Sequence, residues 1–423
     1  MPPVNHPPST VNHVAVIGGG AAGLVAAIFA GRAGARVTLF ETTKRGGKKI
    51  VVSGGGRCNV LPGDVDVRRF VTDSSVNVLR RILASWPLPE QRTFFEDELG
   101  VPLSLEPETG KLFPTSNRAL DVRDALVAGV ERAGVATRFE TRVADLQPVA
   151  GGWAVTPVGR ASEVFGRVVL ATGGLSVPKT GSDGFGLDAA RALGHRLVAP
   201  YPALTPLTAS GRPHAGLSGL SLTARLQTPQ KKNRIATHDG FLFTHRGYSG
   251  PAVLDLSHRT TLARRAGTSQ EVAVQWTDRD ADAWDAALRA PSAGLVATLV
   301  RDALPTRLAD TLLSEAGVPL ERTRAELTRD ERRRLVAALT AYPLPHDGDE
   351  GYVKAEVTGG GVPLGDVDPV TLESRHAPGL FLAGELLDAF GPIGGYNFLW
   401  AWATGRLAGR GAAAGEPFEE ETE

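Results

Sequence analysis

The chain has 423 residues and equal formal charges, 46 Lys and Arg against 46 Asp and Glu, so no global field attracts nucleic acid or an anionic membrane. Its length suggests two or three domains. A single cysteine excludes an internal disulfide and a multi-cysteine metal site, and no apolar run approaches the roughly 18 residues of a membrane helix. We therefore expect a cytoplasmic protein with no metal site, no membrane segment and no obligate protein partner.

After a flexible N-terminus of residues 1–13, the first elements form a repeating pattern. Residues 14–17, VAVI, are an apolar run typical of a strand buried on both faces. A glycine-rich turn and the helically spaced LVAAIFAGRAG follow, and RVTLFE at 36–41 predicts the next strand. Strand, glycine turn, helix and strand in this order predict a βαβ unit.

The turn itself reads GGGAAG and satisfies G-x-G-x-x-G at Gly18, Gly20 and Gly23. The first glycine permits a tight turn, the second lets the backbone approach a pyrophosphate, and the third allows close packing of helix on strand. Glu41 ends the second strand, where its carboxylate can accept hydrogen bonds from ribose hydroxyls. The sequence therefore predicts a dinucleotide site.

The rest of the chain contains further α/β segments, interrupted by a segment with a different secondary-structure pattern. Further helix and strand patterns continue the first domain to residue 197. Short alternating strands between Pro and Gly breaks predict a β-rich subdomain at 198–280, and helical spacing predicts a second subdomain at 281–347. The α/β pattern returns at 348–415, before an acidic tail at 416–423. We predict an α/β, Rossmann-like domain (14–197 and 348–415) with an inserted antiparallel β-barrel and a helical subdomain.

Additional glycine turns favour FAD over NAD as the dinucleotide. They lie at Gly46–Gly47, Gly54–Gly56, Thr172–Gly174 and Gly394–Asn397, at the ends of predicted strands or the starts of helices. Backbone meets ligand at such places in an open α/β sheet. The last turn opens a helix, whose positive end suits the negative N1/O2 side of a reduced flavin.

These motifs resemble the BaiN-like family of bacterial NAD(P)/FAD-dependent oxidoreductases over nearly the whole chain. The matching segments include VAVIGGGAAGLVAA, GGKKIVVSGGGRCNV, LATGGLSVPKTGSDGFG and GLFLAGELLDAFGPIGGYNFLWAWATGRLAG. The resemblance implies a flavoprotein that reduces conjugated C=C bonds, in sterol-like molecules or in a uridine of ribosomal RNA. The residues predicted to bind FAD are Gly18, Gly20, Ala21, Ala22, Gly23, Glu41, Lys49, Ser53, Gly54, Gly55, Gly56, Arg57, Cys58, Asn59, Val143, Ala171, Thr172, Gly173, Gly174, Gly384, Glu385, Gly394, Gly395, Tyr396 and Asn397.

Cys58, His245 and Tyr396 are the candidates for catalysis. Cys58 is open to three interpretations: a small packing residue, a flavin contact, or an acid that protonates the carbon opposite hydride addition. His245 and its neighbour Arg246 lie in a Gly- and Pro-rich loop of the insert that can present side chains to substrate, or the loop is only a structural turn. Tyr396 can donate a proton or merely pack at the start of its helix.

The sequence thus predicts an FAD-dependent oxidoreductase that reduces an activated C=C bond with electrons from NADH or NADPH. No second G-x-G-x-x-G turn follows the strand ending at 170–174, so we expect NAD(P)H to dock transiently over the flavin. The substrate is expected to be a small molecule or RNA. The alternative is a flavin-bound binding or RNA-associated protein in which the insert recognises a partner.

Overall fold

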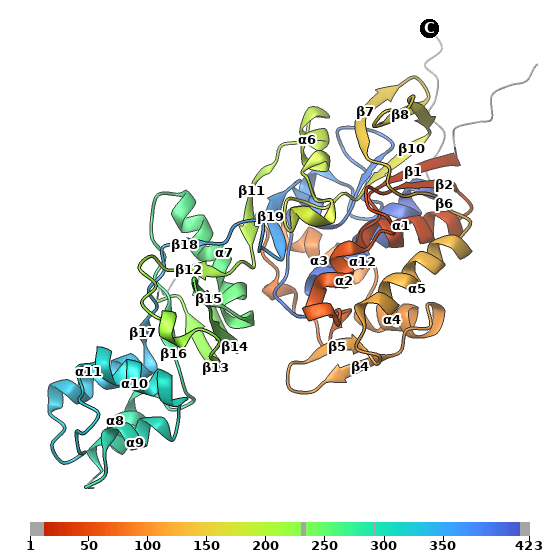
Figure 1. Cartoon of the computed structure of the whole chain (residues 1–423). Coiled ribbons are helices and arrows are strands. Elements are labelled where there is room, and N and C mark those ends of the chain that lie inside the picture. Colours follow the sequence, from red (N-terminus) through yellow and green to blue (C-terminus); the bar gives the residue numbers. More distant parts are fainter. Residues whose placement is uncertain (1–11, 230–233, 291–292, 415–423) are drawn as a thin grey trace, which may run out of the picture. The chain divides into compact units, whose positions relative to one another are not determined.

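The structure is a computed structural model that describes residues 12–229, 234–290 and 293–414 (Figure 1). The chain divides into two compact units. Met1–Tyr201 and Glu356–Glu423 form the parent domain, and Pro202–Ala355 form the insert. The predicted acidic tail at 416–423, and all but the end of the predicted flexible N-terminus, lie outside the described residues.

The parent domain is built on a parallel sheet with the strand order β20-β10-β1-β2-β6 in the described chain. Its strands are β1 (His13–Ile17), β2 (Arg36–Phe40), β6 (Ala136–Arg138), β10 (Arg167–Leu170) and β20 (Leu380–Leu382). The apolar run at 14–17 is almost completely buried, as a strand covered on both faces requires. The predicted βαβ unit and Rossmann-like class are confirmed.

Two long helices, α1 (Ala21–Arg32) and α12 (Tyr396–Ala414), cross at very short distance. A Cβ on Gly405 would lie 2.4 Å from Ala22 O, and one on Gly409 would lie 2.2 Å from Ala26 O. Only glycine permits this approach of the two backbones. The crossing places the middle of α12 beside the first turns of α1.

Smaller elements complete the parent domain. Its other helices are α2 (Lys48–Val52), α3 (Val76–Ala84), α4 (Leu88–Thr93), α5 (Ala119–Arg132) and α6 (Phe185–Ala192). One antiparallel sheet consists of β3 (Leu61–Pro62), β4 (Leu103–Glu106) and β5 (Lys111–Pro114), and another of β7 (Val143–Val149), β8 (Gly152–Pro157) and β9 (Glu163–Phe165). A separate two-stranded sheet pairs β11 (Val198–Ala203) with β19 (Val357–Gly361).

The insert contains an antiparallel sheet of seven strands in its described part, in the order β17-β16-β13-β14-β15-β12-β18. A flat sheet of this width would separate its edges by about 29 Å, since strands lie about 4.8 Å apart. The edge strands are nevertheless only five steps apart in the chain, from Pro343 to Gly348, which span at most about 18 Å. The sheet must therefore curl toward closure, in agreement with the predicted barrel. The strands are β12 (Leu207–Thr208), β13 (Ser221–Gln227), β14 (Ala236–Phe243), β15 (Gly247–Ser249), β16 (Ala273–Gln275), β17 (Tyr342–Pro343) and β18 (Gly348–Asp349).

The boundaries of the insert differ from the predicted 198 and 347. The compact unit starts at Pro202 and ends at Ala355 because β18 pairs with β12, which keeps residues 348–355 with the insert. The predicted β-rich part also contains a helix, α7 (Pro251–Arg265), that was not expected there. Pro251 at its first turn, after Gly250 at φ +93°, starts this helix, a signal that resembles a turn in the sequence.

The helical part of the insert packs around buried aromatic side chains. Trp276 and Trp284 are at most 2% exposed, and Thr328 with Glu331 forms a complete capping box at the start of α11. The helices here are α8 (Ala281–Arg289), α9 (Val296–Arg301), α10 (Thr306–Glu315) and α11 (Arg329–Thr340). Across the described ranges, no helix combines the length and apolar character needed to cross a membrane.

Candidate functional site

The three glycines of the motif differ in what surrounds them. A Cβ on Gly18, whose φ is +102°, would lie 2.5 Å from Ala171 O, and one on Gly23 would lie 1.8 Å from Gly18 O. These two glycines therefore serve the packing of β1, β10 and α1. Gly20 is different, because no heavy atom lies within 4 Å of the position its Cβ would take. The open side of Gly20 at the start of α1 is where a pyrophosphate can approach the backbone.

Glu41 lies beside this turn with a buried carboxylate. Its Oε2 accepts a hydrogen bond from Gly19 N at 2.7 Å, and its Oε1 accepts one from Thr43 N at 2.6 Å. Each carboxylate oxygen has a second lone pair, so the group retains acceptor capacity for a hydroxyl. Ribose binding by Glu41 stays a prediction, and the structure adds that this side chain also holds the glycine turn.

The 53–59 turn follows α2 and contains consecutive left-handed glycines, with Gly55 at φ +67° and Gly56 at φ +88° and no heavy atom within 4 Å of either Cβ position. Asn59 ends the turn, and its Oδ1 is buried without a hydrogen-bond partner. A buried acceptor of this kind normally has a donor, and the hydroxyl and N–H groups of FAD offer one. With the open side of Gly20, this orphaned oxygen shows that the residues present fit FAD.

Arg57 in the same turn contacts protein groups. Its guanidinium donates to Glu106 Oε1 at 2.8 Å and to Asn117 Oδ1 at 3.1 Å, and lies 3.8 Å from the centre of the Phe113 ring. These contacts hold the 53–59 turn against β4 and β5. Ser53 likewise donates its hydroxyl to Ile50 O at 2.7 Å.

Cys58 is completely buried and belongs to the core of the parent domain. Burial raises the pKa of its thiol to about 12, so the thiol stays protonated at neutral pH, and its backbone adopts φ +64°. A side chain without exposed surface does not reach a substrate arriving from solvent. The structure therefore favours the packing interpretation.

Cys58→Ala is expected to lower the free energy of unfolding by about 1 kcal/mol and to leave the rate of substrate reduction within about twofold of wild type. A general acid contributes about 100-fold or more to the rate, so the two roles separate clearly. Stopped-flow oxidation of the reduced protein by substrate measures the rate, and denaturant unfolding measures stability. If Cys58→Ala binds FAD normally but reduces substrate about 100-fold more slowly than wild type, Cys58 acts as the general acid.

The two glycines at the start of α12 lie close to other segments of the parent domain. A Cβ on Gly395 would lie 2.4 Å from Leu61 C, and one on Gly394 would lie 3.1 Å from Lys111 Cε. Asn397 makes two hydrogen bonds to the backbone of Gly391, each of 2.9 Å, which close the loop before the helix. These contacts explain the glycines and Asn397 structurally, and ligand binding at these positions stays a prediction.

Tyr396 is 4% exposed, with its ring against Phe70 and Arg69. Its hydroxyl accepts from Arg69 NH1 at 3.3 Å and from Asp66 N at 3.4 Å. These contacts hold residues 66–70 against α12. Proton donation by Tyr396 stays a prediction, and it requires the hydroxyl to leave these partners or to act beside them.

Of the remaining predicted residues, Ala171 to Gly174 directly follow β10, and Gly384 lies just after β20. Gly174 and Gly384 lie in tight turns, where added Cβ atoms would meet Thr358 Oγ1 at 2.4 Å and Ala22 Cβ at 2.9 Å. The rest of this set also lies in the parent domain, partly or fully buried: Ala21, Ala22, Val143, Ala171, Thr172 and Gly173. Val143 starts β7, so its backbone belongs to a different sheet.

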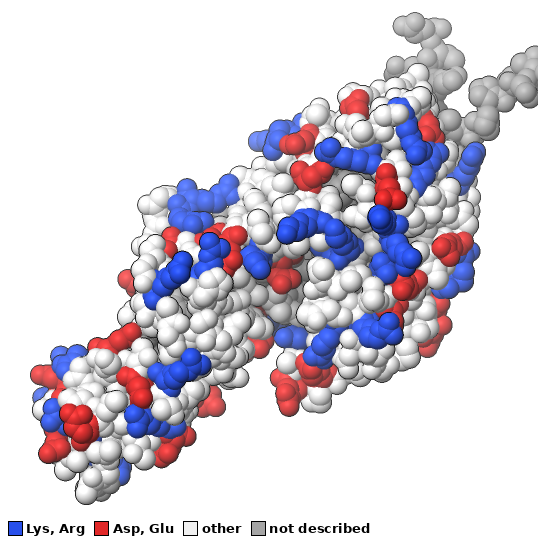
Figure 2. All heavy atoms as spheres, in the orientation of Figure 1, with Lys and Arg blue, Asp and Glu red and all other residues white. Residues whose placement is uncertain are grey.

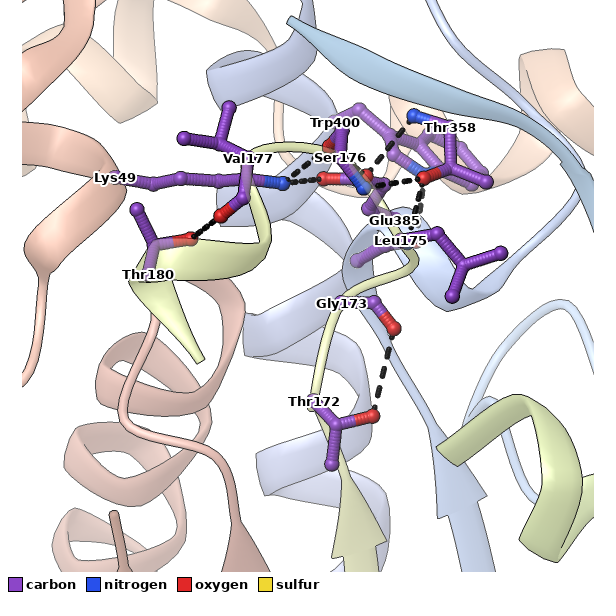
Figure 3. A network of polar contacts seen from close by, with 11 residues as sticks. Lys49, Thr172, Gly173, Leu175, Ser176, Val177, Thr180, Thr358, Glu385 and Trp400 are labelled. Carbon is purple, nitrogen blue, oxygen red and sulfur yellow. Dashed lines mark hydrogen bonds and ion pairs between the residues drawn. The ribbon is translucent and has the colours of Figure 1, made fainter. Parts of the chain in front are cut away.

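A polar network that the sequence analysis only half identified joins these turns (Figure 3). Lys49 Nζ donates to Glu385 Oε2 at 2.5 Å and to Ser176 Oγ at 2.6 Å, and Ser176 Oγ donates to Glu385 Oε1 at 2.5 Å. Thr358 N also donates to Glu385 Oε1, at 2.9 Å, while Thr358 Oγ1 accepts from the backbone of Leu175 and Ser176. The network fastens four separate segments together. Lys49 and Glu385 were predicted, but Ser176 and Thr358 were missed.

Burial opposes ionisation of Glu385, but Lys49 and the hydroxyl and N–H donors outweigh it and lower the pKa of the carboxyl below its ordinary value. Glu385→Gln is expected to reduce the free energy of unfolding at pH 7 by about 2 kcal/mol, because Lys49 loses its counter-charge. A lowered folded pKa gives stability that is complete above the unfolded carboxyl pKa of about 4.3 and is lost as pH falls through the folded value. The difference between wild type and variant should therefore shrink below about pH 4.

Urea unfolding of both proteins from pH 7 downward measures this difference. Glu131→Gln, on the exposed surface of α5, is the matched control and should change stability little at any pH. A constant difference between wild type and Glu385→Gln across the acidic range would show that the charge of Glu385 contributes nothing.

His245, the third catalytic candidate, lies in the insert on the exposed turn between β14 and β15. Thr244 closes this turn, since its N donates to Gly247 O at 2.8 Å. Arg246 lies 3.7 Å from Glu350. His245 is also one of the residues that line a small depression: Ala209, Arg212, Pro213, His214, Ala215, Thr244, His245, Gly247 and Tyr248.

Beneath this depression lies a buried polar cluster that the sequence analysis missed. His214 Nδ1 lies 2.8 Å from Tyr248 OH, and His214 Nε2 lies 3.0 Å from Tyr342 OH and 3.2 Å from Glu315 Oε1. Burial raises the pKa of both tyrosines, so both hydroxyls remain protonated donors at neutral pH. The residues come from four distant segments, and no local pattern signals them.

A parallel α/β sheet with an open glycine turn at its first helix defines a Rossmann-type dinucleotide-binding protein whose ligand set suits FAD. The sequence matches the family model of the HI0933-like protein Rossmann domain over residues 12–411, and the chain belongs to this family. The resemblance stated from the motifs is thereby confirmed, and with it a flavin-dependent oxidoreductase.

Known relatives match over nearly their full lengths. The chain is 33% identical over 411 residues to the 3-dehydro-bile acid delta(4,6)-reductase of Clostridium scindens, covering 95% of this chain and 99% of that protein. It is 31% identical over 391 residues to the ribosomal RNA dihydrouridine synthase of Escherichia coli, covering 92% and 95%. The solved 3-ketosteroid delta1-dehydrogenase of Sterolibacterium denitrificans has a TM-score of 0.50 at 14% identity, with 95% and 100% covered, which shows a shared fold.

Proposed function

We propose that this protein reduces an activated carbon–carbon double bond of a small molecule, with NADH or NADPH as the electron donor. The observation that supports it most is the match to the bile acid reductase, which covers 95% of this chain and 99% of that protein. A match of this extent includes the insert as well as the parent domain. The segment expected to contact substrate is therefore shared together with the cofactor domain.

Bound FAD would supply hydride transfer to an electron-poor carbon. The chain provides the frame for it: the open backbone at Gly20 admits the pyrophosphate, and Asn59 Oδ1 accepts a hydrogen bond. Lys49 and Glu385 keep the turns after β10 and β20 in place. A network with this many mutual contacts holds its turns rigidly, which is the condition for orienting substrate.

Ribosomal RNA is the second substrate class to consider, because a relative at 31% identity is an RNA dihydrouridine synthase. RNA binding relies on clustered Lys and Arg that neutralise phosphates. On the face of the molecule in Figure 2, basic and acidic side chains are interspersed, and the formal net charge of the chain is zero. These observations favour a small molecule.

The two substrate classes separate in one experiment. Purified FAD-loaded protein is reduced anaerobically with NADPH and mixed in parallel with a 3-oxo-Δ4 steroid and with unmodified ribosomal RNA, and products gaining two hydrogens are sought by mass spectrometry. Reduced steroid with unchanged RNA supports the proposal. Dihydrouridine without reduced steroid assigns the second class. Failure of both NADPH and NADH, each tested separately, to bleach the flavin contradicts the proposed donor.

The nicotinamide is expected to use the same cleft as the substrate, because the sequence holds one G-x-G-x-x-G turn between a strand and a helix and no second one. The two molecules would then bind alternately and give ping-pong kinetics. Initial rates measured while both concentrations vary should yield parallel double-reciprocal lines. Intersecting lines, which indicate a ternary complex, would reveal a separate nicotinamide site.

A further inference from the structure

A cluster of metal-ligating side chains lies in the parent domain outside the FAD site. His195 follows α6, Asp366 ends the short helical turn Leu364–Asp366, and His376 precedes β20. Each residue offers one ligand atom, and the three atoms lie within 4.8 Å of one another. His195 Nδ1 is 3.5 Å from Asp366 Oδ2, and His376 Nε2 is 3.2 Å from the same oxygen.

His195, the buried histidine, gives the strongest indication of a metal site. The His195 side chain has no exposed surface, and its Nδ1 faces the cluster without a hydrogen-bond partner. Its other ring nitrogen, Nε2, lies 2.8 Å from Ser374 Oγ, which fixes the ring plane. A ligand histidine is typically held in this way, by a hydrogen bond on the nitrogen opposite the metal.

The spacing suits a small transition-metal ion. Zn²⁺ binds imidazole nitrogen and carboxylate oxygen at about 2.0–2.1 Å, so neighbouring ligand atoms in a tetrahedral site lie about 3.4 Å apart. The two distances to Asp366 Oδ2, 3.2 and 3.5 Å, already match this value. Asp366 and His376 are 23% and 41% exposed, which leaves an open side for a water ligand and for entry of the ion.

From this geometry we propose that His195, Asp366 and His376 bind one divalent transition-metal ion of the Zn²⁺ class. Two imidazoles and one carboxylate are borderline ligands that select such ions over Mg²⁺ or Ca²⁺. Binding would connect the segment after α6 with the 366–376 loop. These residues are far apart in the chain and form no spacing motif, so the sequence predicts no metal site.

Isothermal titration of chelator-treated, FAD-loaded protein with Zn²⁺ tests the proposal. We expect one saturable equivalent per chain at micromolar zinc, and a weakening of at least about tenfold in Asp366→Asn and in His376→Gln. The variant at His376 is expected to fold because this side chain is partly exposed, whereas a substitution of the fully buried His195 can prevent folding. Co²⁺ should give the visible absorption of a tetrahedral site in wild type and lose it in both variants.

His238→Gln is the matched control, because it removes another histidine that faces a carboxylate, Asp278 at 3.8 Å, on the exposed surface of the insert. Its zinc affinity should equal that of wild type. Absence of saturable binding, or binding that is equal in wild type, Asp366→Asn and His376→Gln, would overturn the proposal. The readout is metal content and affinity, so it is independent of the proposed reductase activity.

Discussion

Gly20→Val should yield a folded protein without FAD. The backbone at Gly20 has φ −77° and ψ −167°, which any residue adopts, and its Cβ position is open, so the substitution does not disturb the free chain. The valine side chain would occupy the space through which a pyrophosphate reaches the start of α1. We expect FAD affinity to fall by about 100-fold or more, about 2.7 kcal/mol.

The measurement is the flavin absorbance of purified protein together with fluorescence titration of apo-protein with FAD, while circular dichroism reports the fold. Gly216→Val is the matched control, since Gly216 in the insert also has no heavy atom within 4 Å of its Cβ position and no left-handed φ. If Gly20→Val retains a normal FAD content, the glycine turn is not part of the cofactor site.

Gly405→Leu should destabilise the parent domain strongly. Its Cβ would lie 2.4 Å from Ala22 O, and because backbone cannot move aside as a side chain does, α12 must separate from α1. We expect the free energy of unfolding to fall by at least about 3 kcal/mol. FAD should be lost as well, since both helices begin beside the predicted site.

Arg410→Leu adds the same side chain to an exposed position of α12 and provides the control for helix propensity and hydrophobicity. Thermal unfolding followed by circular dichroism and by flavin release compares the two variants. Similar stability of Gly405→Leu and Arg410→Leu would mean that the close crossing of the helices contributes little.

Features that depend on near neighbours in the chain were predictable from the sequence. The run at 14–17, the G-x-G-x-x-G turn and Glu41 follow one another within a single βαβ unit. Their spacing therefore predicts both the fold and the dinucleotide site. The order of parent domain, β-rich part and helical part also followed from local periodicity. The helix α7 was missed because its Gly-Pro start resembles a turn.

Features that depend on distant contacts were not predictable in the same way. Gly395 is predicted to lie at the ligand, and its close contact with Leu61, on another strand, is a packing role that the sequence does not reveal. Ser176 and Thr358 join Lys49 and Glu385 only because the fold brings the ends of β10, β19 and β20 together. The sequence shows that Cys58 is the one cysteine of the chain, but its burial follows from the packing of the whole core and is not visible in the sequence.

The strands at the two ends of the insert bear on how such proteins diversify. β11, which leads into the insert, pairs with β19, which leads out of it, and inside the insert β12 pairs with β18. Both ends of the segment therefore start from neighbouring strands. Insertions or deletions between these strands can change the length of the insert without altering the strand order of the parent sheet or the glycine turn.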